Sequence, residues 1–187
     1  MFDGPRALAA ETLTIGRGHA ERIAGAVRER LDEAGTDVSG ISGIAVVAGP
    51  GSFTGLRAGL AFARGLALGL GVPATGVSRM RALAHGRGPV RVVLDARREA
   101  VFHQAFAAGG EPVSDLALTP VDVFRGGPEP LAGSGASLVA GDRGVLFDHD
   151  APPPQAIAAV ARIAPLPARP IYGRGADAKV QRPPLSA

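Results

Sequence analysis

The sequence contains no cysteine and no tryptophan, only one tyrosine, and only one lysine, Lys179. Without cysteine the chain has no disulfide, no thiolate nucleophile and no cysteine-based zinc site. Charged residues interrupt every apolar stretch before it reaches the roughly 18 residues that a membrane-spanning helix needs. We therefore expect no membrane association and a cytoplasmic protein.

The basic character of the chain is a weak argument for nucleic-acid binding. Its isoelectric point is about 10.5, but 20 Lys and Arg residues against 17 Asp and Glu give a formal net charge of only +3. The arginines are scattered rather than clustered, and aromatic residues for base stacking are scarce. The residues alone do not predict direct RNA contact.

The clearest pattern lies in residues 44–78. An apolar run from Ile44 to Val47 is followed by a glycine-rich loop, a helical segment up to Leu70, and a second apolar run that opens at Pro73. This order predicts strand, loop, helix and strand. With 187 residues and 46% hydrophobic content, the chain can bury a core as one domain or two small ones.

The motif loop has two interpretations. Its residues are Gly49, Pro50, Gly51, Ser52, Phe53, Thr54 and Gly55. Glycines before a helix can bind an anion, but this spacing is neither the Rossmann nor the Walker A motif, and Ser52 is not in a nucleophile elbow. The other interpretation is a tight strand-to-helix turn in which Thr54 is the N-cap.

The helix after the loop is apolar on almost every side. Its first face is formed by Leu56, Leu60, Ala63, Ala67 and Leu70. Gly55, Gly59 and Ala63 form a row of small residues, and the only charged residues are Arg57 and Arg64. Interior glycines (Gly59, Gly65 and Gly69) each cost a helix about 1 kcal/mol relative to alanine. Either this helix is buried within its own domain, or it serves a subunit interface.

Residues 18–34 form a second amphipathic helix with Gly35 as its C-cap. His19 and Glu21 begin this helix but point to different sides of it, which indicates a first-turn cap rather than a metal site. His85, His103 and His149 show no H-x-x-x-H spacing. We therefore predict no metal ligands and no catalytic residues, and the sequence assigns no residue to a cofactor.

The two ends of the first unit carry turn signals. Asp3-Gly4 is typical of a type I′ hairpin turn, and a weak strand is expected from Arg6 to Leu13. Gly86 to Pro89 has the composition of a hinge. We therefore divide the chain into residues 1–88, a smaller unit 89–169, and a C-terminal segment 170–187 that is partly disordered.

The second unit offers weak candidates for chemistry. Strands are predicted at Val90 to Leu94 and Ala100 to Phe106. The segment between them suggests either a catalytic Asp95 with a phosphate clamp at Arg97 and Arg98, or a polar hairpin turn, which we favour. The pair Gly133 and Gly135 is weak evidence for a phosphate-binding site. Short helices are expected at 119–122 and from 152 to 163.

The stretch GPGSFTGLRAGLAFARGLALGLGVPATGVS resembles the signature of the bacterial TsaB (YeaZ) family. Similar segments occur at Gly18-His19-Ala20-Glu21, Asp95-Ala96-Arg97-Arg98-Glu99-Ala100-Val101 and Pro170-Ile171-Tyr172-Gly173-Arg174. These proteins are accessory subunits of the machinery that makes threonylcarbamoyladenosine in tRNA. TsaB proteins open with a strand carrying an I-D-T-S-like segment that has no counterpart here, so we expect a late start site or a truncated gene model.

The resemblance implies an α/β protein of two actin-like (ASKHA, ribonuclease-H-like) lobes, the second of them small. In TsaB-like proteins the first two helices form a helical bundle with a second TsaB or with the catalytic relative TsaD. On these helices the expected interface residues are His19, Glu21, Arg22, Thr54, Arg57, Gly59, Ala63 and Arg64.

The function that the resemblance implies is that of a non-catalytic accessory subunit. It would bind a TsaD-type threonylcarbamoyltransferase and stimulate its action on adenosine 37 of tRNA. Further expected partners are a TsaE-type ATPase, a second copy of the chain when alone, and tRNA indirectly; ATP is used by the complex. Two alternatives stay open, namely an ATP-binding enzyme of the actin-like superfamily and a metallopeptidase.

Overall fold

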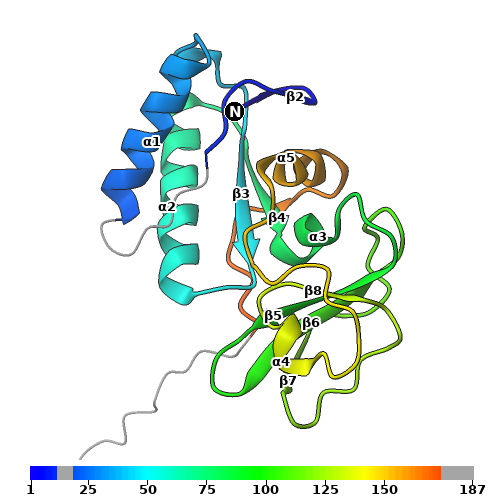
Figure 1. The fold of residues 1–187 in the computed structure, drawn as a ribbon. Coiled ribbons are helices and arrows are strands. Elements are labelled where there is room, and N and C mark those ends of the chain that lie inside the picture. Colours follow the sequence, from blue (N-terminus) through cyan, green and yellow to red (C-terminus); the bar gives the residue numbers. More distant parts are fainter. Residues whose placement is uncertain (12–18, 174–187) are drawn as a thin grey trace, which may run out of the picture.

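Two small sheets with helices around them form the framework of the molecule (Figure 1). The structure is a computed structural model and describes residues 1–11 and 19–173, with side chains for all of these except 19–21. The first sheet has the order β3 (Ile44–Gly49), β4 (Ala74–Ser78), β9 (Leu166–Pro167). The second has the order β7 (Ala117–Pro120), β6 (Ala100–Phe106), β5 (Val90–Asp95), β8 (Leu131–Ala132).

The predicted strand-loop-helix-strand unit is confirmed. Strands β3 and β4 pair in parallel, with Ile44 opposite Ala74 and Val47 opposite Val77. Helix α2 (Phe53–Leu70) makes the crossover and contacts β3. Its buried residues, Leu56, Leu60, Ala63 and Ala67, all belong to the predicted apolar face. The helix ends at Gly71, whose φ of 68° is the left-handed conformation that favours glycine.

Helix α1 (His19–Glu33) lies beside α2 on the outside of the molecule (Figure 1). Its predicted C-cap is confirmed, because Gly35 has a φ of 65° and Thr36 N–H donates to the carbonyl of Leu31 at 3.1 Å. Leu31 is the one buried side chain among those described for α1, and Ala24 on the predicted apolar face is exposed. The helix is therefore held by a narrow contact.

The N-terminal hairpin pairs β1 (Phe2–Asp3) with β2 (Arg6–Ala7), so its two-residue loop is Gly4-Pro5. Gly4 has a positive φ of 54°, but proline fixes φ near −65°, which excludes the predicted type I′ turn. The strand expected from Arg6 to Leu13 is also too long, because β2 ends at Ala7. The last two residues of that expected strand, 12 and 13, lie outside the described part.

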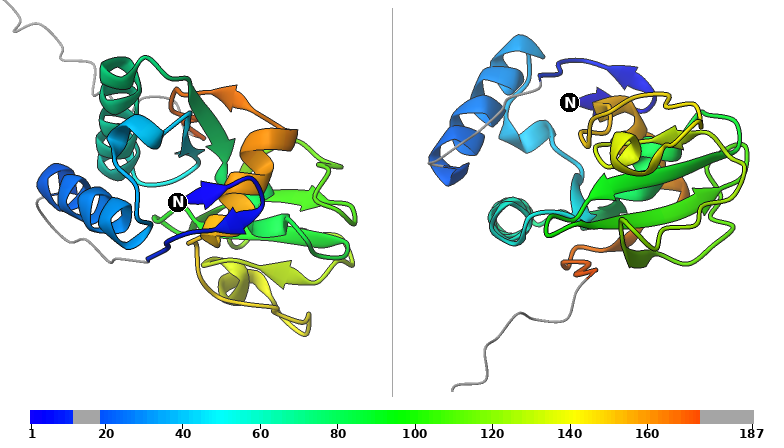
Figure 2. Two further views of the ribbon diagram at one scale, coloured as in Figure 1. Left: turned by 90° about the horizontal axis from the view of Figure 1, so that it is seen from above. Right: turned by 60° about the horizontal axis from the view of Figure 1, so that its bottom comes forward.

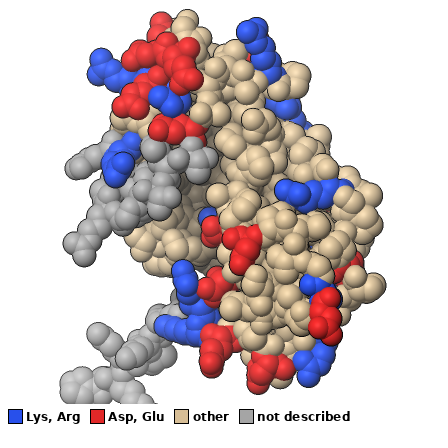
Figure 3. Space-filling view, viewed as in Figure 1, with Lys and Arg blue, Asp and Glu red and all other residues tan. Residues whose placement is uncertain are grey.

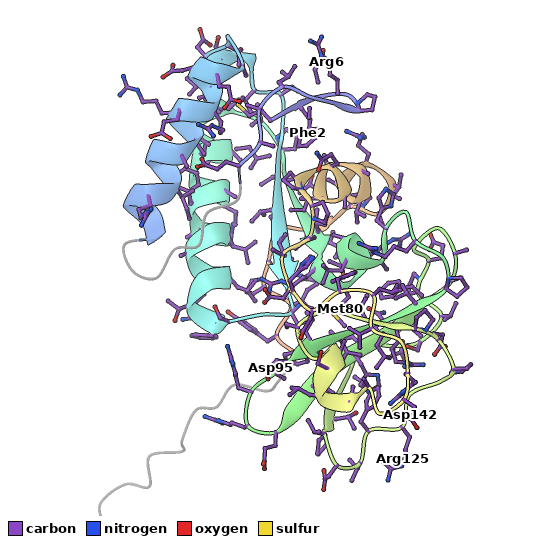
Figure 4. All side chains as sticks on the ribbon, in the orientation of Figure 1. Phe2, Arg6, Met80, Asp95, Arg125 and Asp142 are labelled. Carbon is purple, nitrogen blue, oxygen red and sulfur yellow. The ribbon has the colours of Figure 1, made fainter. Side chains whose placement is uncertain are left out.

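A short buried helix, α3 (Arg79–Ala84), packs against both sheets. Met80, Leu83 and Ala84 pack with second-sheet residues, namely Val90, Val92, Leu94, Phe102, Phe106 and Ala132. Figure 4 shows Met80 at this junction. The segment after α3 is tied down as well, because Arg87 Nε donates to the carbonyl of Leu83 at 2.9 Å and its guanidinium lies 4.4 Å from the ring centre of Phe147.

Residues 154–167, which we assigned to the second unit (89–169), return to the first sheet. Helix α5 (Pro154–Ile163) begins where prolines predict a start, and its Ala156 and Val160 pack against Val77 and Ala82. Strand β9 pairs antiparallel with β4. A side chain at Gly76 of β4 would collide with the Pro167 backbone. The apolar face of α5 thus packs against the first sheet rather than the second.

The second sheet also corrects one predicted helix. Residues 117–120 form β7, which pairs with β6 from Ala100↔Pro120 to His103↔Ala117, and 121–123 form a turn. Pairing with β6 therefore outweighs the local helix signal. Helix α4 (Ala136–Val139) covers β5. None of the helices in the described ranges is long and apolar enough to cross a bilayer.

The α3 core predicts a large cost for Leu83→Ala. Leu83 is 1% exposed, and removing a buried leucine typically costs about 2 to 5 kcal/mol. Urea unfolding followed by circular dichroism should show this loss in one cooperative transition. Leu138→Ala, at an exposed site on α4, is the control and should change stability by less than about 0.5 kcal/mol. Two separated transitions, or a loss similar to that of the control, would contradict the packing of α3 against both sheets.

Candidate interaction site

The motif loop connects β3 to α2 through a glycine that no other residue can replace. Gly49 has a φ of 123°, and a Cβ there would lie 2.7 Å from the carbonyl oxygen of Ile171. Ile171 reaches this position because its N–H donates to the carbonyl of Ala48 at 2.8 Å. The C-terminal segment 170–173 therefore packs directly against the loop.

The remaining residues of the motif loop cap helix α2 or allow close packing in the turn. Ser52, not the predicted Thr54, is the N-cap of α2, because its Oγ accepts from Gly55 N–H at 3.1 Å. Both are good capping residues, but Thr54 already lies inside the helix. At Gly51 a Cβ would lie 2.9 Å from the Arg79 guanidinium, which pairs with Asp150 at 2.8 Å. This packing supports the turn interpretation of the loop over the anion-binding one.

One side of α2 faces solvent along its whole length. We call this surface the α2 strip; its residues are Phe53, Arg57, Ala61, Arg64 and Leu68, all exposed. Leu68 is 85% exposed, which is unusual for a leucine in a helix that also covers a sheet. Beside the second half of the strip runs an open groove of about 580 Å³, lined in part by Ala61, Gly65, Leu68 and Val72.

The predicted interface residues do not share one face. Arg57 and Arg64 lie on the α2 strip, and Thr54 is exposed in the first helical turn. Gly59 is five residues from Arg64, hence about 140° away around the helix axis. Ala63 is buried in the core of the chain, at 5% exposure, so it is not available as a direct contact.

The predicted interface residues on α1 are less fully described. Arg22 is exposed on this helix. His19 and Glu21 lie in its first turn, but their side chains are outside the described part of the structure. In Figure 3 acidic and basic side chains gather over the upper end of α1, where Arg30 pairs with Glu11, Glu29 and Glu33. This charged end contrasts with α2, whose charged residues are two arginines.

The interior glycines of α2 have no explanation in the packing of the described residues. A Cβ built at Gly59, Gly65 or Gly69 would have no atom of those residues within 4 Å. Close packing within the described part of the chain therefore does not account for Gly59, which we expected at an interface. Each glycine still costs the helix about 1 kcal/mol.

Tyr172 is a site residue that the sequence did not single out by chemistry. Its ring centre lies 5.4 Å from that of Phe53, and its hydroxyl accepts from Arg57 Nε at 3.2 Å. The guanidinium of Arg57 lies 3.9 Å from the centre of the Phe53 ring. The resemblance around Pro170 to Gly173 was the one signal that this segment matters.

The structure supports the turn interpretation of residues 95–99. Asp95 Oδ1 accepts from Arg97 N–H at 2.7 Å, and Ala96 N–H donates to the carbonyl of Ala100 at 2.9 Å. Asp95 lies below the N-terminal end of α2 in Figure 4. Three successive residues, Arg97, Arg98 and Glu99, have positive φ values of 61°, 54° and 54°. For residues with a Cβ this is a strained turn.

Gly133 and Gly135 are explained by packing on β5. A Cβ at Gly133 would lie 2.5 Å from the carbonyl oxygen of Val93, and one at Gly135 would lie 2.8 Å from Asp95 N. Both glycines thus let the loop approach β5 closely, which accounts for them without a phosphate.

The second sheet carries a polar pair that is structural in character. His103 Nδ1 lies 3.3 Å from Arg91 Nη1, and His103 Nε2 lies 2.9 Å from Thr119 Oγ1. Because Arg91 can only donate, Nδ1 is the acceptor and Nε2 carries the proton. Burial and, next, the charge of Arg91 lower the pKa of His103. Within the described ranges no cluster of three or more His, Asp or Glu residues could hold a metal ion.

Comparisons with known proteins identify relatives of this chain by sequence. A family model described as TsaD, tRNA N6-adenosine threonylcarbamoyltransferase, matches residues 13–126. TsaB of Escherichia coli is 41% identical over 92 residues, which are 46% of this chain and 40% of that protein. An uncharacterised protein of Mycobacterium tuberculosis is 33% identical over 178 residues, 90% of this chain and 82% of the relative.

Solved structures show the same fold. A Pseudomonas aeruginosa protein with similarity to the peptidase YeaZ has a TM-score of 0.72 at 28% identity, over 84% of this chain and 85% of the other. YeaZ from the same organism has a TM-score of 0.70 at 27% identity, over 83% and 85%. The expected α/β, actin-like fold is therefore confirmed.

Fold and site thus define a protein of the actin-like class, and the exposed face of α2 is its candidate site. The chain belongs to the TsaD family of tRNA threonylcarbamoyladenosine biosynthesis, as a homologue of TsaB (YeaZ).

The strained turn predicts that Glu99→Gly stabilises the chain. A positive φ costs a residue with a Cβ about 1 to 2 kcal/mol, and glycine avoids this cost but gives up about 0.5 to 1 kcal/mol of chain entropy. We expect a net gain of up to about 1.5 kcal/mol in the free energy of unfolding, measured with urea. Glu99→Ala is the control, since it removes the same carboxylate but keeps the Cβ. A Glu99→Gly variant no more stable than Glu99→Ala would contradict a strain larger than the entropy cost of glycine.

Proposed function

We propose that this chain is a non-catalytic accessory subunit that binds a TsaD-type threonylcarbamoyltransferase and stimulates the modification of adenosine 37 in tRNA. Membership in the family supports a role in threonylcarbamoyladenosine biosynthesis. The α2 strip supports the finer proposal that the role is exercised through binding. The catalytic subunit is the proposed occupant of that strip, with α1 flanking the contact.

The observation that carries the proposal is the exposed face of α2. Leu68 and Phe53 are 85% and 52% exposed on one helix, and arginine with aromatic residues is a composition enriched in interfaces. The groove beside Leu68 offers a concave surface of about 580 Å³ for a partner side chain or helix. Exposed apolar side chains that are grouped on one surface and flanked by polar residues are a common mark of a protein–protein interaction site.

The glycines of α2 support close approach by that partner. Gly65 and Gly69 are exposed, and no described atom would meet a Cβ at either site. Small residues let two helix backbones come closer than larger side chains allow. A partner helix packed here would use space that the chain itself leaves open.

Packing also supports the non-catalytic part of the proposal. Asp95 accepts a hydrogen bond within its own turn, and β5 occupies the space beside Gly133 and Gly135. Helix α3 packs against both sheets with buried apolar side chains. These features weigh against the alternatives of an ATP-binding enzyme and a metallopeptidase.

The remaining roles follow from the same proposal. A TsaE-type ATPase completes the complex, ATP is used there rather than held by this chain, and tRNA is reached through the complex. In the absence of the catalytic subunit, the α2 strip pairs with a second copy of the chain. The whole assembly acts in the cytoplasm.

The proposal predicts that Arg64→Glu weakens binding of a TsaD homologue from the same organism. The change reverses the charge in the middle of the strip at an exposed position. Affinity measured by calorimetry should fall at least about tenfold, which is 1.4 kcal/mol, and stimulation of tRNA modification in a reconstituted assay should fall with it. Arg6→Glu, on the hairpin at the other end of the molecule from the start of α2 (Figure 4), is the control. Unchanged affinity for Arg64→Glu would contradict the proposed interface.

A further inference from the structure

Arg57 is held in place before any partner arrives. Its guanidinium stacks 3.9 Å from the centre of the Phe53 ring, while its Nε donates to the Tyr172 hydroxyl at 3.2 Å. The tyrosine ring in turn contacts Phe53 at a centroid distance of 5.4 Å and an interplanar angle of 33°. Each member of this trio contacts the other two, so the planar group has few orientations left.

Tyr172 can act as a support because its neighbours in the chain are themselves fixed. Ile171 N–H donates to the carbonyl of Ala48 at 2.8 Å. Gly173 lies so close to Phe102 of β6 that a Cβ would collide with the phenyl ring. The tyrosine is thus attached between the end of the first sheet and the second sheet, as the right-hand view of Figure 2 shows for the segment that ends beneath them.

The charge of Arg57 is not balanced within the described part of the chain. No described acidic side chain forms an ion pair with it, and α2 contains no Asp or Glu at all. The guanidinium uses Nε internally, so its two terminal amino groups remain for another acceptor. Phe53 and Tyr172 are 52% and 44% exposed, which leaves the trio open to solvent.

We propose that Phe53, Arg57 and Tyr172 form a preformed anchor for a carboxylate, namely an Asp or Glu side chain of the catalytic subunit. This inference rests on the proposed function, because the trio is continuous with the α2 strip through Phe53 and Arg57. The strip carries positive charge only, and its complement is an acidic residue. Arginine binds carboxylates through two parallel hydrogen bonds, a geometry that lysine cannot reproduce.

Preorganisation is what the third residue adds. A long side chain that is ordered only on binding weakens affinity by about two- to tenfold. Stacking on Phe53 and the hydrogen bond to Tyr172 remove that loss in advance. Tyr172 is therefore a positioning residue, and it couples the C-terminal segment to the binding surface of α2.

The test measures affinity for a TsaD homologue from the same organism by calorimetry. Tyr172→Phe keeps the ring but removes the hydroxyl acceptor, and should weaken binding about two- to tenfold. Arg57→Lys keeps the charge but loses the fork, and should weaken it at least about tenfold. Arg6→Lys is the matched control and should leave affinity unchanged. Melting temperatures of the free variants should stay close to that of the parent chain, because Arg57 and Tyr172 are exposed.

A double-mutant cycle separates positioning from general packing. If Tyr172 acts through Arg57, then Tyr172→Phe has no further effect in the Arg57→Lys background, because the two changes break one unit. The affinity of the parent chain should also fall more steeply with added salt than that of Arg57→Gln. Independent, additive losses or equal salt dependence would overturn the anchor.

Failure of the anchor and failure of the interface give different results. If Arg64→Glu weakens binding while Arg57→Lys and Tyr172→Phe behave like Arg6→Lys, the strip binds the partner but the anchor is wrong. If Arg64→Glu also leaves affinity unchanged, the proposed function itself is wrong. If the Arg57 and Tyr172 variants alter only self-association of the chain, the carboxylate does not belong to the catalytic subunit and the inference fails.

Discussion

At Gly49 the chain has to turn with a positive φ while the backbone of Ile171 passes within van der Waals contact. Both demands exclude a side chain, and three parts of the structure meet there. Strand β3 ends, α2 begins three residues after Pro50 under the Ser52 cap, and the C-terminal segment docks through Ile171. The direction of α2, and with it the placement of its exposed face, depends on this turn.

The turn also explains why distant residues share one surface. Once Ile171 is bonded to Ala48, Tyr172 reaches Arg57 although 115 residues separate them in the chain. A similar return brings α5 and β9 back to the first sheet, where they cover Val77 and pair with β4. The two sheets are further joined by α3, and Phe102 of the second sheet lies in the same hydrophobic cluster as Met80 of α3 and close to Gly173 of the C-terminal segment.

Local patterns in the sequence were enough to predict the elements that local physics determines. The apolar face of α2, the C-cap at Gly35 and the strands beside the motif loop all follow from periodicity or from one residue's conformational preference. The N-cap was placed at Thr54 instead of Ser52 because both residues can cap and only the geometry separates them. The helix expected at 119–122 was wrong because pairing with β6 is a long-range effect.

The candidate site could likewise be predicted only in part from the sequence. Resemblance directed attention to α2 and its arginines, yet it could not show that Ala63 faces inward, that Gly59 and Arg64 lie on different sides, or that Tyr172 supports Arg57. These facts depend on the rotation of one helix and on a contact across most of the chain. Local sequence patterns predict neither the rotation of a helix nor a contact between distant residues.

The central claim is that the α2 strip and the C-terminal segment together bind the catalytic subunit. Hydrogen–deuterium exchange of the chain, alone and with a TsaD homologue from the same organism, tests it most directly. The account predicts slower exchange on complex formation across residues 53–70 and at 170–173, with little change in the second-sheet strands β6 and β7. Slower exchange confined to β6 and β7, with α2 unaffected, would contradict it.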